Sequence, residues 1–298
     1  MRARAIRHDR RDLSLDEPRP ATRRSFLAMM AALIGPSASA QDDAEDRGKS
    51  SPRLEAMRRL AKEVKVCEIS DGKPGRPLVL RPEPLLRFSN PADVTLDGTL
   101  WGWGERGRPP ALIKLGLRER PPGQMHWHFG VTALSPKRVE VEFGDGSRWS
   151  SRLPGLPLRS VPDAPPPADS AAQRLTQAKA IARRVSIGVE RQTAARRIQL
   201  RLLPRPIDLY SDPTAGLLDG VLFGFVDATV PVVLLLLEAW SEGPGASKWR
   251  CAFMRQAAGE MTALLDGKLV WSVPRVPQPA DTELFKARGM PASPEEQD

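Results

Sequence analysis

The chain has few of the residues on which many catalytic and metal sites depend. Its 298 residues include only three histidines and two cysteines. One histidine, His8, lies in the N-terminal region that we interpret below as a signal peptide. No serine stands in a Gly-x-Ser-x-Gly sequence, the nucleophile elbow of many hydrolases. A hydrolase triad is therefore not indicated.

Signals for phosphate and nucleic-acid binding are also missing. Gly102-Trp103-Gly104 resembles a glycine-rich loop, but it precedes a strand, so no helix N-terminus would stand behind a phosphate. The formal net charge of +9 falls to +5 without residues 1–40, which hold eight Lys/Arg and four Asp/Glu. Because the remaining basic residues are scattered, we expect no nucleic-acid partner.

The N-terminus has the features of an export signal. Residues 22–27, Thr-Arg-Arg-Ser-Phe-Leu, fit the twin-arginine pattern of a basic pair followed by an aromatic residue and leucine. A weakly apolar stretch and the small residues Ala38-Ser39-Ala40 follow. We predict a twin-arginine-type signal peptide over residues 1–40, cleaved after Ala40, and an exported protein in the periplasm or the medium. A Sec signal that happens to contain Arg-Arg is the alternative.

The chain also aligns with itself. A shift of 122 residues places Arg76–Trp149 over Ile198–Trp271 without a gap, with 18 identities in 74 pairs. About four to six identities are expected from composition. Trp127 and Trp149 then meet Trp249 and Trp271. We interpret the chain as a tandem duplication.

Each repeat is predicted to consist of one N-terminal helix and a mostly antiparallel sheet of five to six strands, an α+β fold. Apolar residues recur at helical spacing at the start of each repeat, and Asp-Gly turns mark the hairpins. The predicted organisation is a signal peptide (1–40), a disordered linker (41–50), repeat 1 (51–155), a proline-rich linker (156–168), repeat 2 (169–277) and a disordered tail (278–298).

One apolar run has the length of a membrane span. Gly220–Leu237 contains Asp227 as its only charged residue. The matching segment Gly98–Leu115 carries four charged residues, and Pro231 marks a turn within the run. We therefore interpret the run as a hairpin of a soluble fold, and we expect no transmembrane segment in the mature protein.

His126 and His128 are the candidate metal ligands. Residues i and i+2 of a strand share a face, so the two imidazoles could chelate zinc, with further ligands sought among Glu140, Glu142 and Asp145. The second repeat has Lys248 and Arg250 around Trp249 at the same places. This pattern favours two surface histidines that flank an inward-pointing Trp127, so no cofactor is predicted beyond the zinc alternative.

Two aromatic residues form the other candidate site. Trp101 and Trp103 alternate with glycines and so face one side of a strand, where they would form a ligand platform if exposed. Phe223 and Phe225 replace them in the second repeat, which favours a core position. The repeated Asp97 and Asp219 precede glycines and are interpreted as turn residues rather than as paired catalytic carboxylates.

Cys67 and Cys251 occupy non-equivalent positions of the two repeats. A disulfide between them and two free thiols both stay open, with free thiols favoured.

These features favour an exported, non-catalytic binding, scaffold or envelope-associated protein, with an envelope protein or polysaccharide as the partner class. The alternative is a cell-envelope hydrolase or metal-dependent enzyme with a site between the repeats. An enzyme should show a polar cluster in one repeat that the other repeat lacks, and the sequence suggests only His126 and His128. Whether the protein is an enzyme therefore stays open, and its ligand is not predicted.

Overall fold

The computed structural model describes residues 52–90, 94–119, 121–190, 197–243 and 245–292. The predicted signal peptide, its cleavage site and the linker 41–50 lie outside the described residues. Among the described residues, 54% are in strands and 12% in helices, with two α-helices and four sheets. The predicted α+β class is therefore wrong, and this part of the chain is mostly β.

The error came from strands that have no strong local signal. Strand β1 (Lys65–Ser70) directly follows the first helix, where we predicted no strand. Strand β9 (Arg159–Ser160) lies in the predicted proline-rich linker, and β19 (Phe285–Pro291) in the tail that we expected to be disordered. All three pair with strands far away in the sequence. Strand formation depends on such partners more than on local propensity.

The first half contains helix α2 (Pro52–Lys62) and two antiparallel sheets. The smaller sheet has the order β2-β1-β7-β8, and the larger one has the order β19-β6-β5-β4-β3. Their remaining strands are β2 (Lys73–Pro77), β3 (Leu86–Asn90), β4 (Thr95–Gly102), β5 (Ala111–Glu119), β6 (Met125–Ala133), β7 (Arg138–Glu142) and β8 (Arg148–Ser150).

The second half, which begins with helix α3 (Ala171–Arg183), has the same strand order. Its smaller sheet is β11-β10-β17-β18, and its larger sheet is β12-β14-β15-β16-β9, with β13 also paired to β14. The strands are β10 (Val185–Glu190), β11 (Arg197–Gln199), β12 (Arg201–Leu202), β13 (Asp208–Asp212), β14 (Leu217–Asp227), β15 (Val230–Gly243), β16 (Ala246–Arg255), β17 (Glu260–Leu265) and β18 (Lys268–Val273); the 3-10 turn η2 (Pro213–Ala215) joins β13 to β14.

Each half has its own core between its helix and its two sheets. In α2, Met57, Leu60 and Ala61 are buried at three- and four-residue spacing and pack on the larger sheet. Ile113, Leu115 and Leu117 of β5 point into the same core, since alternate residues of a strand share a face. The intervening residues of β5, among them Lys114, point to the opposite face of the sheet.

The larger sheets of the two halves share a third apolar cluster. Leu100 and Leu112 of the first half pack there with Leu222, Leu234 and Leu236 of the second. Strand β15 is consequently buried on both faces, which explains the long apolar run that we interpreted as a hairpin. No helix among the described residues is long and apolar enough to span a membrane.

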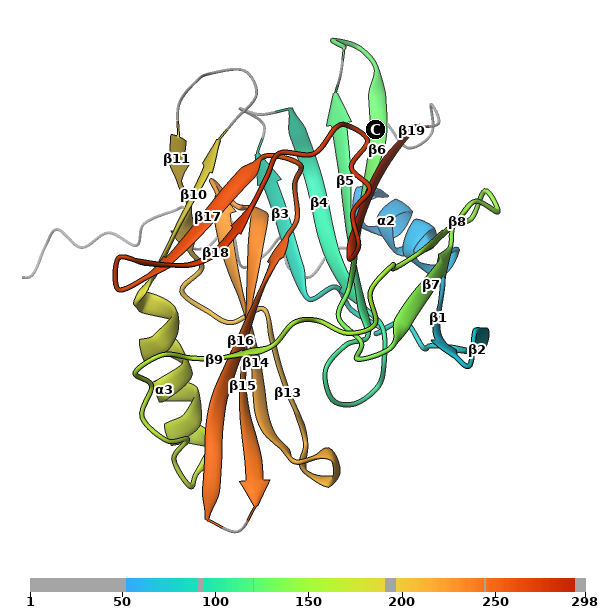
Figure 1. Cartoon of the computed structure of the whole chain (residues 1–298). Coiled ribbons are helices and arrows are strands. Elements are labelled where there is room, and N and C mark those ends of the chain that lie inside the picture. Colours follow the sequence, from blue (N-terminus) through green and yellow to red (C-terminus); the bar gives the residue numbers. More distant parts are fainter. Residues whose placement is uncertain (1–51, 91–93, 120, 191–196, 244, 293–298) are drawn as a thin grey trace, which may run out of the picture. The chain divides into compact units, whose positions relative to one another are not determined.

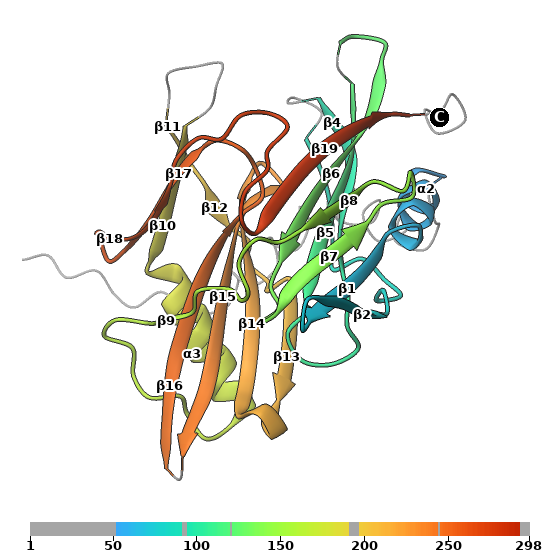
Figure 2. The same ribbon diagram turned by 45° about the vertical axis from the view of Figure 1, so that its right-hand side comes forward.

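The segments that follow each half are exchanged between the halves. Strand β9, which follows the first half, pairs with β16 of the second half, and β19 at the end of the second half pairs with β6 of the first. Figures 1 and 2 both show the red β19 lying along the green β6. The β19 pairing runs from Phe285↔Thr132 to Pro291↔His126, whereas β9 pairs at only two positions. The exchange therefore extends the two larger sheets unequally.

The two Asp-Gly pairs that open the predicted hairpins are not turns. They lie within β4 and β14, each next to a register shift. The ring of Phe88 lies over Gly98 and that of Tyr210 over Gly220, so that any Cβ atom there would collide with the ring. These two glycines thus allow an aromatic residue of the neighbouring strand to lie flat on the sheet.

Candidate functional site

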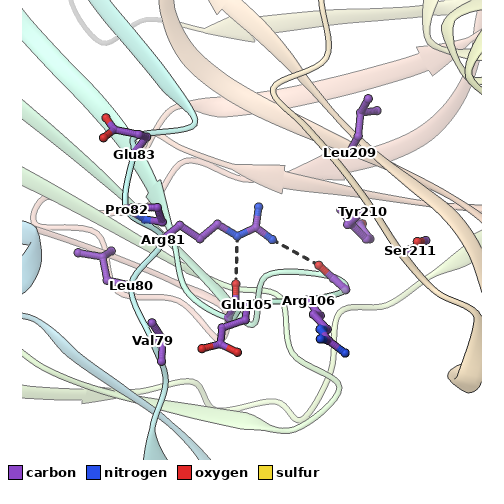
Figure 3. A pocket seen from close by; sticks show the side chains of 12 residues that line it. Val79, Leu80, Arg81, Pro82, Glu83, Glu105, Arg106, Leu209, Tyr210 and Ser211 are labelled. Carbon is purple, nitrogen blue, oxygen red and sulfur yellow. Dashed lines mark hydrogen bonds between the residues drawn. The ribbon is translucent and has the colours of Figure 1, made fainter.

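Residues of both halves line two hollows. The larger, of about 720 Å³, surrounds Arg81 and is called the Arg81 hollow (Figure 3). The Arg81 guanidinium donates to the backbone oxygens of Gly104 and Gly107, at 3.1 and 3.4 Å, and its Nη1 lies 2.6 Å from Oδ2 of Asp208. Burial raises the pKa of the Asp208 carboxyl, an effect that Arg81 opposes. Because these contacts occupy Arg81, we interpret the hollow as a structural junction between the halves.

The second hollow, of about 530 Å³, is called the Lys114 cavity. One wall is the face of the first half's larger sheet that points away from α2. The opposite wall comes from the second half, mainly from the segments that follow β16 and β18. Strand β19 closes one side with Phe285 and Ala287. A second-half segment thus reaches the sheet of the first half at this cavity.

Lys114 is a buried cation in this cavity. Lys114 is only 7% exposed. Its Nζ donates hydrogen bonds to the backbone oxygen of Pro231, at 3.1 Å, and to that of Gln256. Among the described residues, no carboxylate lies within salt-bridge distance of Nζ. Burial lowers the pKa of Lys114 to about 7, with a further contribution from the positive charge of Arg118.

Arg118 and His128 lie on the same face of the sheet as Lys114. Arg118 follows Lys114 by four residues on β5, and His128 is paired with Gly116, which lies between them. Burial lowers the pKa of His128 to about 3, and the charges of Lys114 and Arg118 act in the same direction. The three groups are therefore close enough to repel one another when charged.

Gln256 adds a polar group to the opposite wall. The residue is 1% exposed, and its Nε2 donates to Oγ1 of Thr132 at 2.6 Å. Within the described part of the chain, Oε1 of Gln256 is buried without a hydrogen-bond partner. A buried carbonyl oxygen without a donor is destabilising, so this atom is suited to a donor from a bound molecule.

The other half places apolar residues at the corresponding positions. Under the 122-residue shift, Lys114 corresponds to Leu236 and Gln256 to Leu134, while Thr132 corresponds to Met254. We did not predict this asymmetry from the sequence, because we considered only histidines, serines and paired carboxylates as site residues. The sequence did contain a signal: Lys114 corresponds to Leu236, which lies within the apolar run Gly220–Leu237 of the second repeat.

The candidate zinc ligands His126 and His128 lie on the face of β6 opposite Trp127, which is fully buried. His128 lines the Lys114 cavity. The carboxylates considered as further ligands lie beyond the core, in or beside the smaller sheet: Glu142 binds Lys65 and Arg148, and Asp145 binds Arg288. No group of three or more His, Cys, Asp or Glu suited to a metal occurs among the described residues.

Trp101 and Trp103, considered as a ligand platform, are 0% and 1% exposed and belong to the core of the first half. Nε1 of Trp101 donates to Oγ1 of Thr99 at 2.8 Å. The rings therefore offer no surface to a ligand. Asp97 and Asp219 are also separate from each other, since Asp97 pairs with Arg87 and Asp219 with Arg174.

Cys67 on β1 and Cys251 on β16 are free thiols in different sheets. Burial raises the pKa of Cys251 to about 11, so this thiol is a poor nucleophile near neutral pH.

Comparison of the chain with protein-family models, with curated proteins and with solved structures finds no match.

Proposed function

We propose that the protein is an exported, non-catalytic binding protein that holds a small molecule in the Lys114 cavity. The single observation that carries the proposal is a polar cavity, lined by both halves, in which Lys114 and Gln256 stand where the other half has leucine. Its volume of about 530 Å³ is within the range of small-molecule sites, roughly 300–1,000 Å³. A buried lysine is unfavourable for folding, so its presence here points to a role in binding.

The residues around the cavity favour binding over catalysis. Its described lining contains no serine or cysteine that could act as a nucleophile. His128, with a pKa of about 3, is too weak a base for proton abstraction near neutral pH. Lys114 is the exception, because a pKa of about 7 suits a general base or an amine nucleophile. Catalysis through Lys114 is therefore the second candidate function.

The binding proposal can be tested by blocking each hollow separately. A Cβ atom on Gly116 would be no closer than 3.9 Å to its neighbours, so Gly116→Leu would extend into the Lys114 cavity without displacing the backbone. Leu209 is 57% exposed and lines the Arg81 hollow, so Leu209→Trp is the matched control.

Ligand-observed NMR with a mixture of small organic acids, neutral sugars and amino acids provides the measurement. We expect at least one compound to bind the wild type and the Leu209→Trp variant but not Gly116→Leu, and to be recovered unchanged. Loss of binding only in Leu209→Trp would assign the ligand to the Arg81 hollow. A compound converted by the wild type but not by a Lys114→Leu variant would establish the catalytic alternative.

The export part of the proposal is supported by the sequence of residues 1–40. Replacing Arg23 and Arg24 together by lysine should abolish twin-arginine export, whereas a Sec substrate would still be exported. Mass spectrometry of exported protein should find Gln41 at the N-terminus. Exported protein that retains Met1 would contradict the predicted cleavage.

A further inference from the structure

We propose that the ligand of the Lys114 cavity is a small organic anion that also carries hydrogen-bond donors, such as a hydroxy acid of the size of a monosaccharide. This inference rests on the proposed function and specifies its ligand class. The anionic group would lie against Lys114, and a hydroxyl or N–H of the same molecule would donate to Oε1 of Gln256.

The need for an anion follows from the charges in the cavity. Lys114 is buried among backbone oxygens, and Arg118 shares its face of the sheet. The carboxylates Glu190 and Asp227 line the same cavity, but neither is within salt-bridge distance of Nζ of Lys114. Arg275 also lines the cavity, from the segment after β18. A carboxylate or phosphate would supply the counter-charge that Lys114 lacks among the described residues. Lys114 has three donors and two protein acceptors, so one N–H remains for a ligand.

The need for a donor follows from Gln256. Its Nε2 is occupied by Thr132, and its buried Oε1 has no partner in the described part of the chain. An aliphatic carboxylate without donors would satisfy Lys114 and leave this oxygen desolvated. A hydroxy acid satisfies both groups. The cavity wall also has apolar parts, Phe285 and Ala287, that suit the carbon face of such a molecule.

Four probes separate these requirements. Glucuronate and glucose 6-phosphate carry both an anion and hydroxyl donors, glucose carries donors alone, and hexanoate carries a carboxylate alone. Isothermal titration calorimetry should find tighter binding of glucuronate or glucose 6-phosphate than of glucose or hexanoate, by about tenfold or more. Whichever of the two anions binds more tightly identifies the acid as a carboxylate or a phosphate.

Two variants install the residue that the other half carries. Lys114→Leu should weaken binding of the anionic probe by about 10–100-fold and leave the weak binding of glucose unchanged. Gln256→Leu should weaken binding of the same probe by about tenfold and leave that of hexanoate unchanged. Circular dichroism and thermal unfolding of both variants check that the fold is retained.

The wild type provides a test that needs no variant. Binding of an anion should weaken as the pH rises from 6 to 9, because Lys114 loses its proton in this range. The other charged or titratable groups around the cavity are Arg118, His128, Glu190, Asp227 and Arg275. Binding that is independent of pH would contradict a contact between the anion and Lys114.

The outcomes separate the two proposals. If glucose binds as tightly as glucuronate, and Gly116→Leu abolishes both, the cavity is a binding site but the anionic class is wrong. If hexanoate binds as tightly as glucuronate, the donor requirement is wrong. If none of the four probes binds at about 10 mM, the ligand class is overturned, whereas a different compound bound in the Gly116-dependent manner would still support the proposed function.

Discussion

Two buried charges on equivalent strands have opposite surroundings. Glu238 on β15 is 0% exposed, and its carboxylate accepts two hydrogen bonds from Arg108, at 2.7 and 2.6 Å, and one each from Tyr210 and Trp240, both at 2.8 Å. Lys114 on β5 has only backbone oxygens as partners. One charge is fully neutralised within the protein, whereas the other has no carboxylate within salt-bridge distance among the described residues.

The pKa values follow this difference. Burial acts to lower the pKa of Arg108, but the hydrogen bonds and charge of Glu238 outweigh it, and the pKa is raised. For Lys114, burial is opposed by no nearby carboxylate, and the pKa is lowered to about 7. The two halves thus hold a buried charge in two ways: Glu238 joins residues of both halves, whereas Lys114 remains without a carboxylate partner in the described part of the chain.

A lysine introduced in the second half, at the position that corresponds to Lys114, would test the comparison most severely. Leu236, the counterpart of Lys114, is fully buried in the cluster between the halves. Leu236→Lys would place an amine among apolar side chains, where pKa shifts of 3–5 units correspond to about 4–7 kcal/mol. We expect a loss of unfolding free energy of this order in urea titrations at pH 7. Leu236→Met, of similar volume, should cost less than about 1.5 kcal/mol. Equal losses for both would show that packing, not charge, limits this position.

Removal of Glu238 should have the next largest effect. Glu238→Ala leaves Arg108 buried and unpaired and removes the acceptor of Tyr210, which should cost about 3–5 kcal/mol. Glu242→Ala is the matched control on the same strand, since Glu242 pairs with Lys248 and Arg250 at the surface, where an ion pair contributes little to stability. Urea unfolding of both variants gives the measurement. A loss at Glu238 as small as that at Glu242 would show that the cluster does not stabilise the junction of the halves.

Lys114→Leu should act in the opposite direction and stabilise the protein, by an amount that depends on pH. Between pH 7 and 10.5 the unfolded state holds the lysine proton and the native state does not, so wild-type stability rises with pH by up to about 1.4 kcal/mol per unit. Below pH 7 both states are charged, and the native state bears the full desolvation cost. The variant lacks this dependence. It should therefore be most stable relative to the wild type at pH 6, with the advantage shrinking by pH 9. A difference that does not change between these pH values would contradict the burial of a titrating lysine.

The self-alignment of the sequence predicted corresponding positions for Trp127 and Trp249, and both lie buried at such positions of β6 and β16. The alignment of Trp127 with Trp249 predicted which face of β6 and of β16 points into the core. Because alternate residues of a strand share a face, it also predicted that His126 and His128 lie on the other face of β6. The predicted fold class, α+β, was nevertheless wrong. Strands such as β1 and β19 are defined by partners about 70 or more residues away, as the pairing of Ile69 with Arg138 illustrates, and no local pattern reveals such partners.

The candidate site was predicted in outline only. The expectation of a polar cluster present in one half and absent from the other gave a usable criterion, but we applied it to His126 and His128 alone. Lys114 met the same criterion through its counterpart Leu236. The contribution of Gln256 could not be predicted, because its contact with Thr132 depends on how the loop after β16 meets the sheet of the first half.

The smallest effect at neutral pH is expected for His128, and it tests whether the basic residues of the cavity form one group. His128 is neutral at pH 7, so His128→Gln should change stability there by less than about 0.5 kcal/mol. As the pH falls from 6.5 towards 3, the unfolded state gains a proton that the native imidazole does not accept, so the wild type loses stability that the variant retains. Carbon-13 NMR of the imidazole should therefore show a neutral ring at pH 4.5. In a Lys114→Leu background the pKa of His128 should rise, since one of the charges that lowers it is gone. An unchanged pKa would show that Lys114 and His128 do not interact electrostatically across the face of the sheet.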